Sequence, residues 1–518
     1  MKKYLIEKKH SLFMKKVIES YNPRLSNHIF PSVEEYDSSD PFGSSNSSIS
    51  DYKKQYQNER CSRSLNLRQI HRTSLQDFLT QILPPVVPTE HIVLPDINHI
   101  LDPEKCIQQL ISKDENIISN ILNQILLASQ NANLTLDSLC SSSDFLNTLA
   151  DCLNHDYSIP LVVQVIQTII TIFPLLESPE LMEEFIDDGI VMSLYDLLSS
   201  DDLMIIAAGI QLTDKICEIS SYGRDAVICL EIHKCLINVA KSENNALVNA
   251  ACEALRKLFA YSEYIDTIPL LNSIEQLAEL LTLNSHSAVE AILICFVEIT
   301  NIQPSLVFSI YNLNILPYLI SLLSDEYLKP VTLRLIGNLC IAQPSQIQMM
   351  FDCGLFQILM ESIYSTCASD AFWVLSNLVE AVPQMILPLL PQNMFHDAVT
   401  LCENASIEIK KEGIFFLATV ILFSEKEKMH DFMTTNMIDL LSEMLGSGVP
   451  LIVLRCLDVL MLFVHNQICN NSQEIISLLL QSDATDRLEE LIEQDQPMIT
   501  ERAKYLLNHV DCSFYQSH

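Results

Sequence analysis

The sequence predicts an all-α fold, a right-handed superhelical solenoid of about ten repeats with a disordered N-terminal tail. Three observations predict it. Of the 518 residues, 49% are apolar and only 9 are glycine, a composition that favours helices. Apolar residues recur at helical spacing from about residue 98 to residue 512. Along the same stretch, a short polar turn followed by an amphipathic helix recurs at a nearly constant interval.

Three segments precede the repeats. Residues 1–51 include the serine-rich run "YDSSDPFGSSNSSIS", which has few large apolar residues and predicts a disordered tail. Residues 52–80 form a basic segment with spaced arginines. Residues 81–97 contain "LPPVVPTEHIVLP", whose four prolines exclude a continuous helix and indicate a linker.

The repeats of residues 98–512 have a period near 42. Equivalent positions are separated by 45, 42, 42, 41, 40, 39, 43 and 48 residues, and these positions are Phe145, Ile190, Ile232, Ile274, Ile315, Leu355, Met394, Met437 and Thr485. The period matches an armadillo or HEAT unit, in which two or three helices stack on the next unit. "FIDDGIVMSLYDLLSS" and "FDCGLFQILMESIYS" show the unit clearly, with Gly189 or Gly354 in the turn before an amphipathic helix.

Charge is unevenly distributed along the chain. The net charge is −34, but residues 1–75 carry 13 Lys/Arg against 8 Asp/Glu, and the remainder carries 18 against 57. The acidic body argues against nucleic acid as its partner and favours basic partners, among them the chain's own tail.

Catalysis, metal binding and membrane insertion are not expected. The sequence has no phosphate-binding glycine loop, zinc-protease motif or nucleophile elbow, so neither an enzyme nor a cofactor is predicted. The 16 cysteines form no C-x-x-C pair, and Cys252 and Cys295 lie within apolar helical runs, as in reduced intracellular proteins. The longest apolar run is interrupted by Gln164 and Gln167, which argues against a membrane span.

Three consecutive stretches resemble central and late repeats of importin-α, in that family's order. They are "LRLIGNLCIAQPSQIQMMFDCGLFQILMESI", "DAFWVLSNLVEAVPQMI" and "IKKEGIFFLATVI". "TDRLEELIEQDQPMITERAKYLLNHV" is similar to the last repeat of the family, and "NLTLDSLCSSSDFLNTLADCL" to the first. The resemblance covers roughly residues 52–510 and is specific in the second half. It implies an armadillo-repeat nuclear import adaptor that shuttles between cytoplasm and nucleus.

In that family, a Trp and an Asn four residues apart recur in successive third helices and line a concave cargo groove. The indole lies beside the aliphatic stem of a cargo Lys or Arg, the amide bonds the cargo backbone, and nearby acids receive the cationic groups. Eight positions of this chain match the minor cargo site, and we call them the late set. They are Arg334, Asn338, Asp370, Trp373, Asn377, Glu412, Phe415 and Thr419.

The family's major cargo site is degenerate in this chain. The matching positions, here called the early set, are Gln167, Thr171, Gln211, Lys215, Glu253 and Lys257. None is aromatic, and Lys215 and Lys257 place cations where the family receives cations, although Glu253 and Lys257 are spaced to pair with each other. Strong binding of a basic peptide is therefore not expected at the early set.

The basic segment resembles the importin-β-binding region of the family. "NERCSRSLNLRQIHRTSL" carries Arg60, Arg63, Arg68 and Arg72, but "LQDFLTQI" follows where the family has a second basic cluster. The resemblance implies three partners, namely Lys/Arg-rich nuclear-localisation-signal cargo, importin-β and the export receptor for importin-α. The alternative is a divergent armadillo scaffold that binds other proteins, which the weakened early set favours.

Overall fold

The computed structural model describes residues 101–130, 136–154, 156–260, 267–302, 306–470, 474–494 and 496–516. The predicted tail, basic segment and linker lie outside these residues, and so do Arg60, Arg63, Arg68 and Arg72. The described residues form helices, with no strand among them. The all-α prediction is confirmed.

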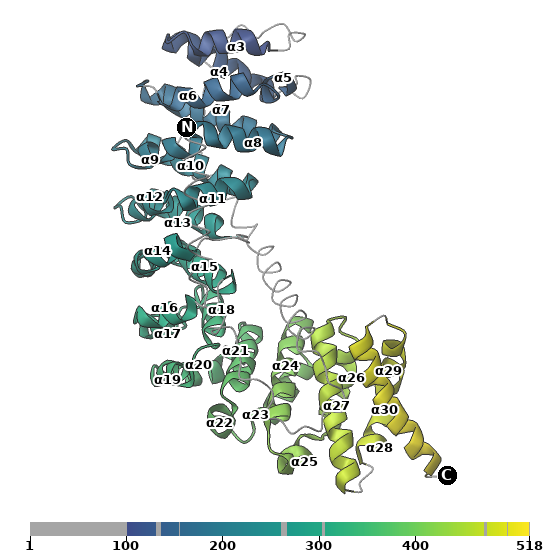
Figure 1. Ribbon diagram of the computed structural model, residues 1–518. Coiled ribbons are helices and arrows are strands. Elements are labelled where there is room, and N and C mark those ends of the chain that lie inside the picture. The colour runs from purple at the N-terminus through teal and green to yellow at the C-terminus, as the bar shows by residue number, and fades with distance from the viewer. Residues whose placement is uncertain are drawn as a thin grey trace, which may run out of the picture. The chain divides into compact units, whose positions relative to one another are not determined.

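Ten long helices in the described part of the chain follow one another at intervals of one repeat, and each packs against the next (Figure 1). We call them the third helices, because each is the last helix of its repeat. They are α4 (Glu115–Ser129), α7 (Ile159–Ile172), α10 (Leu203–Ile219), α13 (Asn245–Phe259), α15 (His286–Ile302), α18 (Lys329–Leu339), α21 (Ala368–Ala381), α24 (Ile407–Phe423), α27 (Pro450–Asn470) and α30 (Pro497–Gln516).

A second helix precedes each third helix. These are α3 (Pro103–Leu110), α6 (Ser143–Asp151), α9 (Val191–Leu198), α12 (His233–Val239), α14 (Thr267–Glu279), α17 (Leu316–Leu322), α20 (Leu355–Ser362), α23 (Met394–Glu403), α26 (Thr435–Leu445) and α29 (Ala484–Ile492). All nine repeat positions predicted from the sequence lie in a second helix or directly before one. The period therefore identified the repeat correctly.

Most repeats open with a shorter first helix. These helices are α5 (Asp137–Cys140), α8 (Pro179–Phe185), α11 (Ser221–Cys229), α16 (Val307–Asn312), α19 (Pro344–Asp352), α22 (Pro383–Ile386), α25 (Met429–Phe432) and α28 (Glu474–Gln481). Short turns extend several repeats, namely η2 (Cys152–Asn154), η3 (Phe173–Leu175), η4 (Ile186–Ile190), η5 (Leu280–Thr282), η7 (Leu387–Leu389) and η8 (Lys426–Lys428). Three helices in most of the described repeats make the fold a right-handed armadillo-repeat solenoid.

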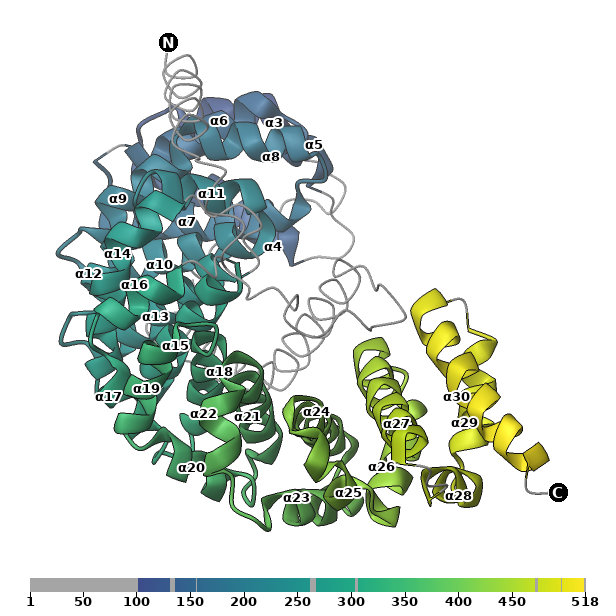
Figure 2. The ribbon, with the colours of Figure 1, turned by 60° about the horizontal axis from the view of Figure 1, so that its bottom comes forward.

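Local sequence accounts for the helix boundaries. Asp114, Asp202 and Asn244 cap α4, α10 and α13, each accepting hydrogen bonds from backbone N–H groups of the first turn. Gly354 has φ +92°, a left-handed conformation that glycine adopts without strain, and it turns the chain from α19 into α20. Figure 2 shows the later third helices, α18 to α30, in the same succession.

The core lies between the helices of neighbouring repeats. Phe372 of α21 and Phe416 of α24 stack with ring centroids 5.6 Å apart, and both are buried. Cys252 and Cys295, which the sequence places in apolar runs, are also fully buried. Because apolar surface is buried between successive repeats, each third helix retains only a narrow face for other contacts.

Candidate functional site

The third helices present the predicted site residues along one face. On α21, Asp370, Asn377 and Glu380 are partly exposed while the rest of the helix interior is buried, and their spacing places them on one stripe. Arg334 and Asn338 form the equivalent stripe on α18. The early set is partly exposed at every position, on α7, α10 and α13. Five third helices thus bring their predicted residues to the same part of the repeat.

Trp373 lies on the α21 stripe and packs against α18. It is 8% exposed, and its ring lies over Gly337, where an added Cβ would come within 1.9 Å of Trp373 Cζ3. Only a glycine at this position leaves room for the indole. The ring is therefore seated between two repeats with a narrow edge exposed.

The asparagines of α18 and α21 bind back to the preceding third helix. Asn377 Nδ2 donates to the Gly337 carbonyl at 3.2 Å. Asn338 Nδ2 donates to Thr300 Oγ1 at 2.9 Å and Asn301 Oδ1 at 2.8 Å, both on α15. Each amide is oriented by the preceding repeat. Asn377 keeps one N–H and its oxygen for another partner, whereas both N–H groups of Asn338 are used and only its oxygen remains.

An ion pair joins the same two helices. Arg334 Nε of α18 lies 3.5 Å from Asp370 Oδ1 of α21, and the two side chains are 26% and 13% exposed. The acid that the resemblance assigns to a cargo cation is therefore already partnered by a cation of the chain.

On α24, unlike on α18 and α21, every member of the late set is buried. Glu412, Phe415 and Thr419 are 3%, 6% and 0% exposed, and Thr419 Oγ1 donates to the Phe415 carbonyl at 2.7 Å. A side chain of α27 covers Phe415, since Arg455 Cζ lies 5.3 Å from its ring centroid. The structure thus aligns the late set on α18 and α21 and encloses it on α24.

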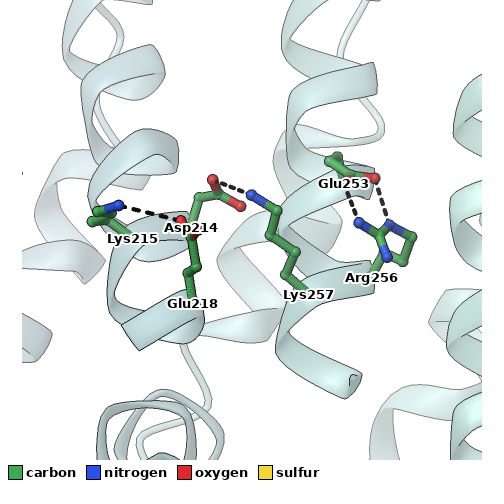
Figure 3. Close-up of polar contacts among 6 residues, drawn as sticks. All are labelled: Asp214, Lys215, Glu218, Glu253, Arg256 and Lys257. Atoms are coloured by element: carbon green, nitrogen blue, oxygen red, sulfur yellow. Dashed lines mark hydrogen bonds and ion pairs between the residues drawn. The ribbon is translucent and has the colours of Figure 1, made fainter. Parts of the chain in front are cut away.

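In the early set, both lysines are paired with acids (Figure 3). Lys257 Nζ of α13 donates to Asp214 Oδ2 of α10 at 2.6 Å, which joins two adjacent repeats. Lys215 Nζ lies 3.4 Å from Glu218 Oε2 on its own helix. Burial raises the pKa of the Asp214 carboxyl, and the Lys257 ammonium opposes that rise.

The expected pairing of Glu253 with Lys257 is wrong. Glu253 accepts two hydrogen bonds from the Arg256 guanidinium, one of them from Nε at 2.7 Å (Figure 3). Arg256 presents a planar fork that binds both carboxylate oxygens, so it outcompetes a single ammonium for Glu253. Lys257 then turns to the neighbouring repeat.

The three remaining early positions lie on α7 and α10. Thr171 Oγ1 donates to the Gln167 carbonyl at 2.8 Å, an i to i−4 bond within α7. Gln211 is partly exposed on α10, one turn before Lys215. Neither helix places an aromatic ring at these positions.

The resemblance missed the residues that partner the predicted ones. Asp214, Glu218 and Arg256 neutralise the early set, and Glu380 and Arg455 lie beside the late set. The sequence offered one signal for these pairs, because Asp214 and Lys257 are 43 residues apart, which is about one repeat. Spacing by one repeat places two side chains on adjacent third helices.

Metal and membrane features can be assessed for the described ranges. No group of three His, Cys, Asp or Glu in those ranges is arranged to hold a metal ion. No single helix there is long and apolar enough to cross a membrane. Only α21 taken together with Pro383–Leu389 has the length and composition of a span, and the two segments are bent by 113°. In the fold, α21 packs between α18 and α24.

No family model matches the sequence, and a search of the curated proteins finds no match. Among solved structures, the chain is similar to an engineered protein of the Northeast Structural Genomics Consortium, with 17% identity, 80% of this chain and 99% of that chain covered, and a TM-score of 0.61. A designed armadillo repeat protein has 17% identity and a TM-score of 0.40 over 45% of this chain and 99% of that chain. The first likeness shows the fold, and neither shows a function.

Fold and site together define an armadillo-repeat scaffold. Scaffolds of this class present a continuous face of parallel third helices, which suits the binding of other proteins or extended peptides. Protein binding is the function that the architecture itself suggests.

Proposed function

We propose that this chain is a nuclear import adaptor. It binds Lys/Arg-rich nuclear-localisation-signal cargo on the third-helix face and couples it to importin-β through residues 52–80. An export receptor returns the empty adaptor, so that the chain shuttles between cytoplasm and nucleus. The early set contributes little, and the α18 and α21 members of the late set carry the cargo.

The observation that carries the proposal is the alignment of Asn338, Trp373 and Asn377 on the stripes of two adjacent third helices, beside the Arg334–Asp370 ion pair. An indole edge between two oriented amides suits an extended peptide that carries a basic side chain. The strongly acidic body adds a long-range attraction for such a peptide.

The second candidate is a scaffold that binds other proteins without recognising localisation signals. Two observations favour it. The lysines of the early set are internally paired, and Glu412, Phe415 and Thr419 are buried. A scaffold of this kind has no requirement for a basic ligand.

A capture experiment separates the two candidates. Immobilised importin-β is incubated with the full chain and with a chain that lacks residues 1–80. Immobilised importin-β captures the adaptor only when residues 1–80 are present. A labelled Lys/Arg-rich peptide binds both forms of the chain, with an affinity that falls as the salt concentration rises.

Two results would contradict the adaptor. One is that immobilised importin-β captures neither form of the chain. The other is equal affinity for the Lys/Arg-rich peptide and for a control peptide in which every Lys and Arg is replaced by Gln. Either result would leave the scaffold as the function.

A further inference from the structure

Arg455 joins three consecutive third helices. It extends from α27, lies over the Phe415 ring of α24 with Cζ 5.3 Å from the ring centroid, and donates from Nη2 to Glu380 Oε1 of α21 at 2.5 Å. Glu380 and Arg455 are 75 residues apart, which is nearly two repeats. Their side chains are 19% and 18% exposed.

Other ion pairs along this face join adjacent third helices. Arg334 pairs with Asp370 of the next helix at 3.5 Å. Arg502 Nε of α30 donates to Asp458 Oδ1 of α27 at 2.7 Å. The Arg455 bridge instead skips a helix, and the skipped helix is the one whose predicted site residues are buried.

The contacts of Arg455 are those that a ligand cation would make. A guanidinium over an aromatic ring gains the cation–π attraction expected for a cargo Lys or Arg, and a carboxylate at its edge supplies the ion pair. The face of Phe415 is thus occupied by a cation of the same chain. A basic ligand side chain would have to displace Arg455 to reach it.

We propose that Arg455 is a specificity-determining residue that excludes a ligand cation from Phe415. Basic side chains of a bound peptide are then received at the Trp373 stripe alone. The chain therefore selects peptides with one short basic cluster over peptides with an extended basic run. The inference rests on the proposed peptide-binding function. It says that one side chain, Arg455, limits which basic peptides the chain can bind.

The test uses full-length chains and a labelled peptide that carries one extended run of Lys and Arg. Arg455→Gln uncovers the Phe415 ring and releases Glu380 from the bridge. We expect the dissociation constant to fall about fivefold, the gain of one partly exposed cation–π contact. Adding Phe415→Leu to Arg455→Gln should abolish the gain, because the new contact requires the ring.

Arg502→Gln is the matched control. It removes the same charge from the neighbouring third helix and also breaks a bridge between third helices, but it leaves Arg455 over the Phe415 ring. Its dissociation constant should stay within about twofold of the parent value, and circular dichroism checks that every variant retains its helices.

The outcomes separate the inference from the proposed function. The inference is overturned, and the proposed function stands, if the parent binds the peptide and Arg455→Gln has the same affinity. An equal gain of affinity in Arg502→Gln has the same meaning. No binding by any chain overturns both. Binding that is stronger in Arg455→Gln and lost again with Phe415→Leu supports both.

Discussion

The early and late sets occupy the same place in their repeats but differ in chemistry. On α10 and α13, charges of both signs pair side by side, with Asp214, Glu218 and Glu253 matched by Lys257, Lys215 and Arg256. On α18 and α21, an indole is seated over a glycine, and two amides are held by hydrogen bonds to the preceding repeat.

The difference teaches that the scaffold sets where a side chain lies and that its neighbours set what it can bind. A paired ammonium offers little to a ligand of either sign, because a new contact must replace an existing one. An aromatic edge between oriented amides offers contacts to both the side chain and the backbone of a peptide. Each region of the comparison can be tested by itself.

The largest effect is expected from removing the Trp373 and Asn377 side chains. Changing both to Ala deletes an indole contact and a backbone clamp, so the affinity for a labelled Lys/Arg-rich peptide should fall roughly tenfold to a hundredfold. Fluorescence anisotropy of the peptide measures the change.

The matched double change in the early set is Gln211→Ala with Lys215→Ala. We expect an affinity within about twofold of the parent, since Lys215 is already paired with Glu218. Similar losses in the two double variants would show that both sets bind the peptide and would end the distinction between them.

A smaller effect is expected from filling the space under the indole. Gly337→Ala places a methyl group 1.9 Å from Trp373 Cζ3, so the ring must move, and the free energy of unfolding should fall by about 1–3 kcal/mol. Urea unfolding followed by circular dichroism measures the loss, and the emission of Trp373 should shift to longer wavelength.

Gly209 of α10 supplies the control in the early region. An added Cβ there lies 3.0 Å from Leu197 Cβ, a tight contact that the better helix propensity of alanine offsets by up to about 1 kcal/mol. Gly209→Ala should therefore unfold near the parent midpoint. Equal losses at both glycines would remove the special role of the indole seat.

The smallest effect is expected from the bridge between α10 and α13. Asp214→Asn leaves Lys257 without its carboxylate in a partly buried position, at a cost of about 1 kcal/mol in the free energy of unfolding. The midpoint of urea unfolding measures it, and Glu490→Gln, in an exposed pair with Arg487, should leave the midpoint unchanged. An unchanged midpoint for Asp214→Asn would mean that the early pairs do not stabilise the stack.

The fold could be predicted from sequence because each repeat buries a local apolar pattern. Phe145 and Met437 were assigned to equivalent helices from spacing alone, and both lie in second helices. Binding of cargo by the late and early sets stays a prediction. The side-chain partners of the site residues could not be predicted, because Arg455 and Glu380 are 75 residues apart in the sequence. The burial of Glu412 could not be predicted either, because it depends on how the neighbouring repeats pack over α24.

The central claim is that basic peptides bind on the stripe of α18 and α21, and the emission of Trp373 tests it most directly. Trp373 is the only tryptophan of the 518 residues, so its signal reports this stripe alone. A Lys/Arg-rich peptide without Trp or Tyr should change the emission in a saturable way, and added salt should weaken the change. Binding of the peptide detected by anisotropy while the emission of Trp373 stays constant would contradict the claim.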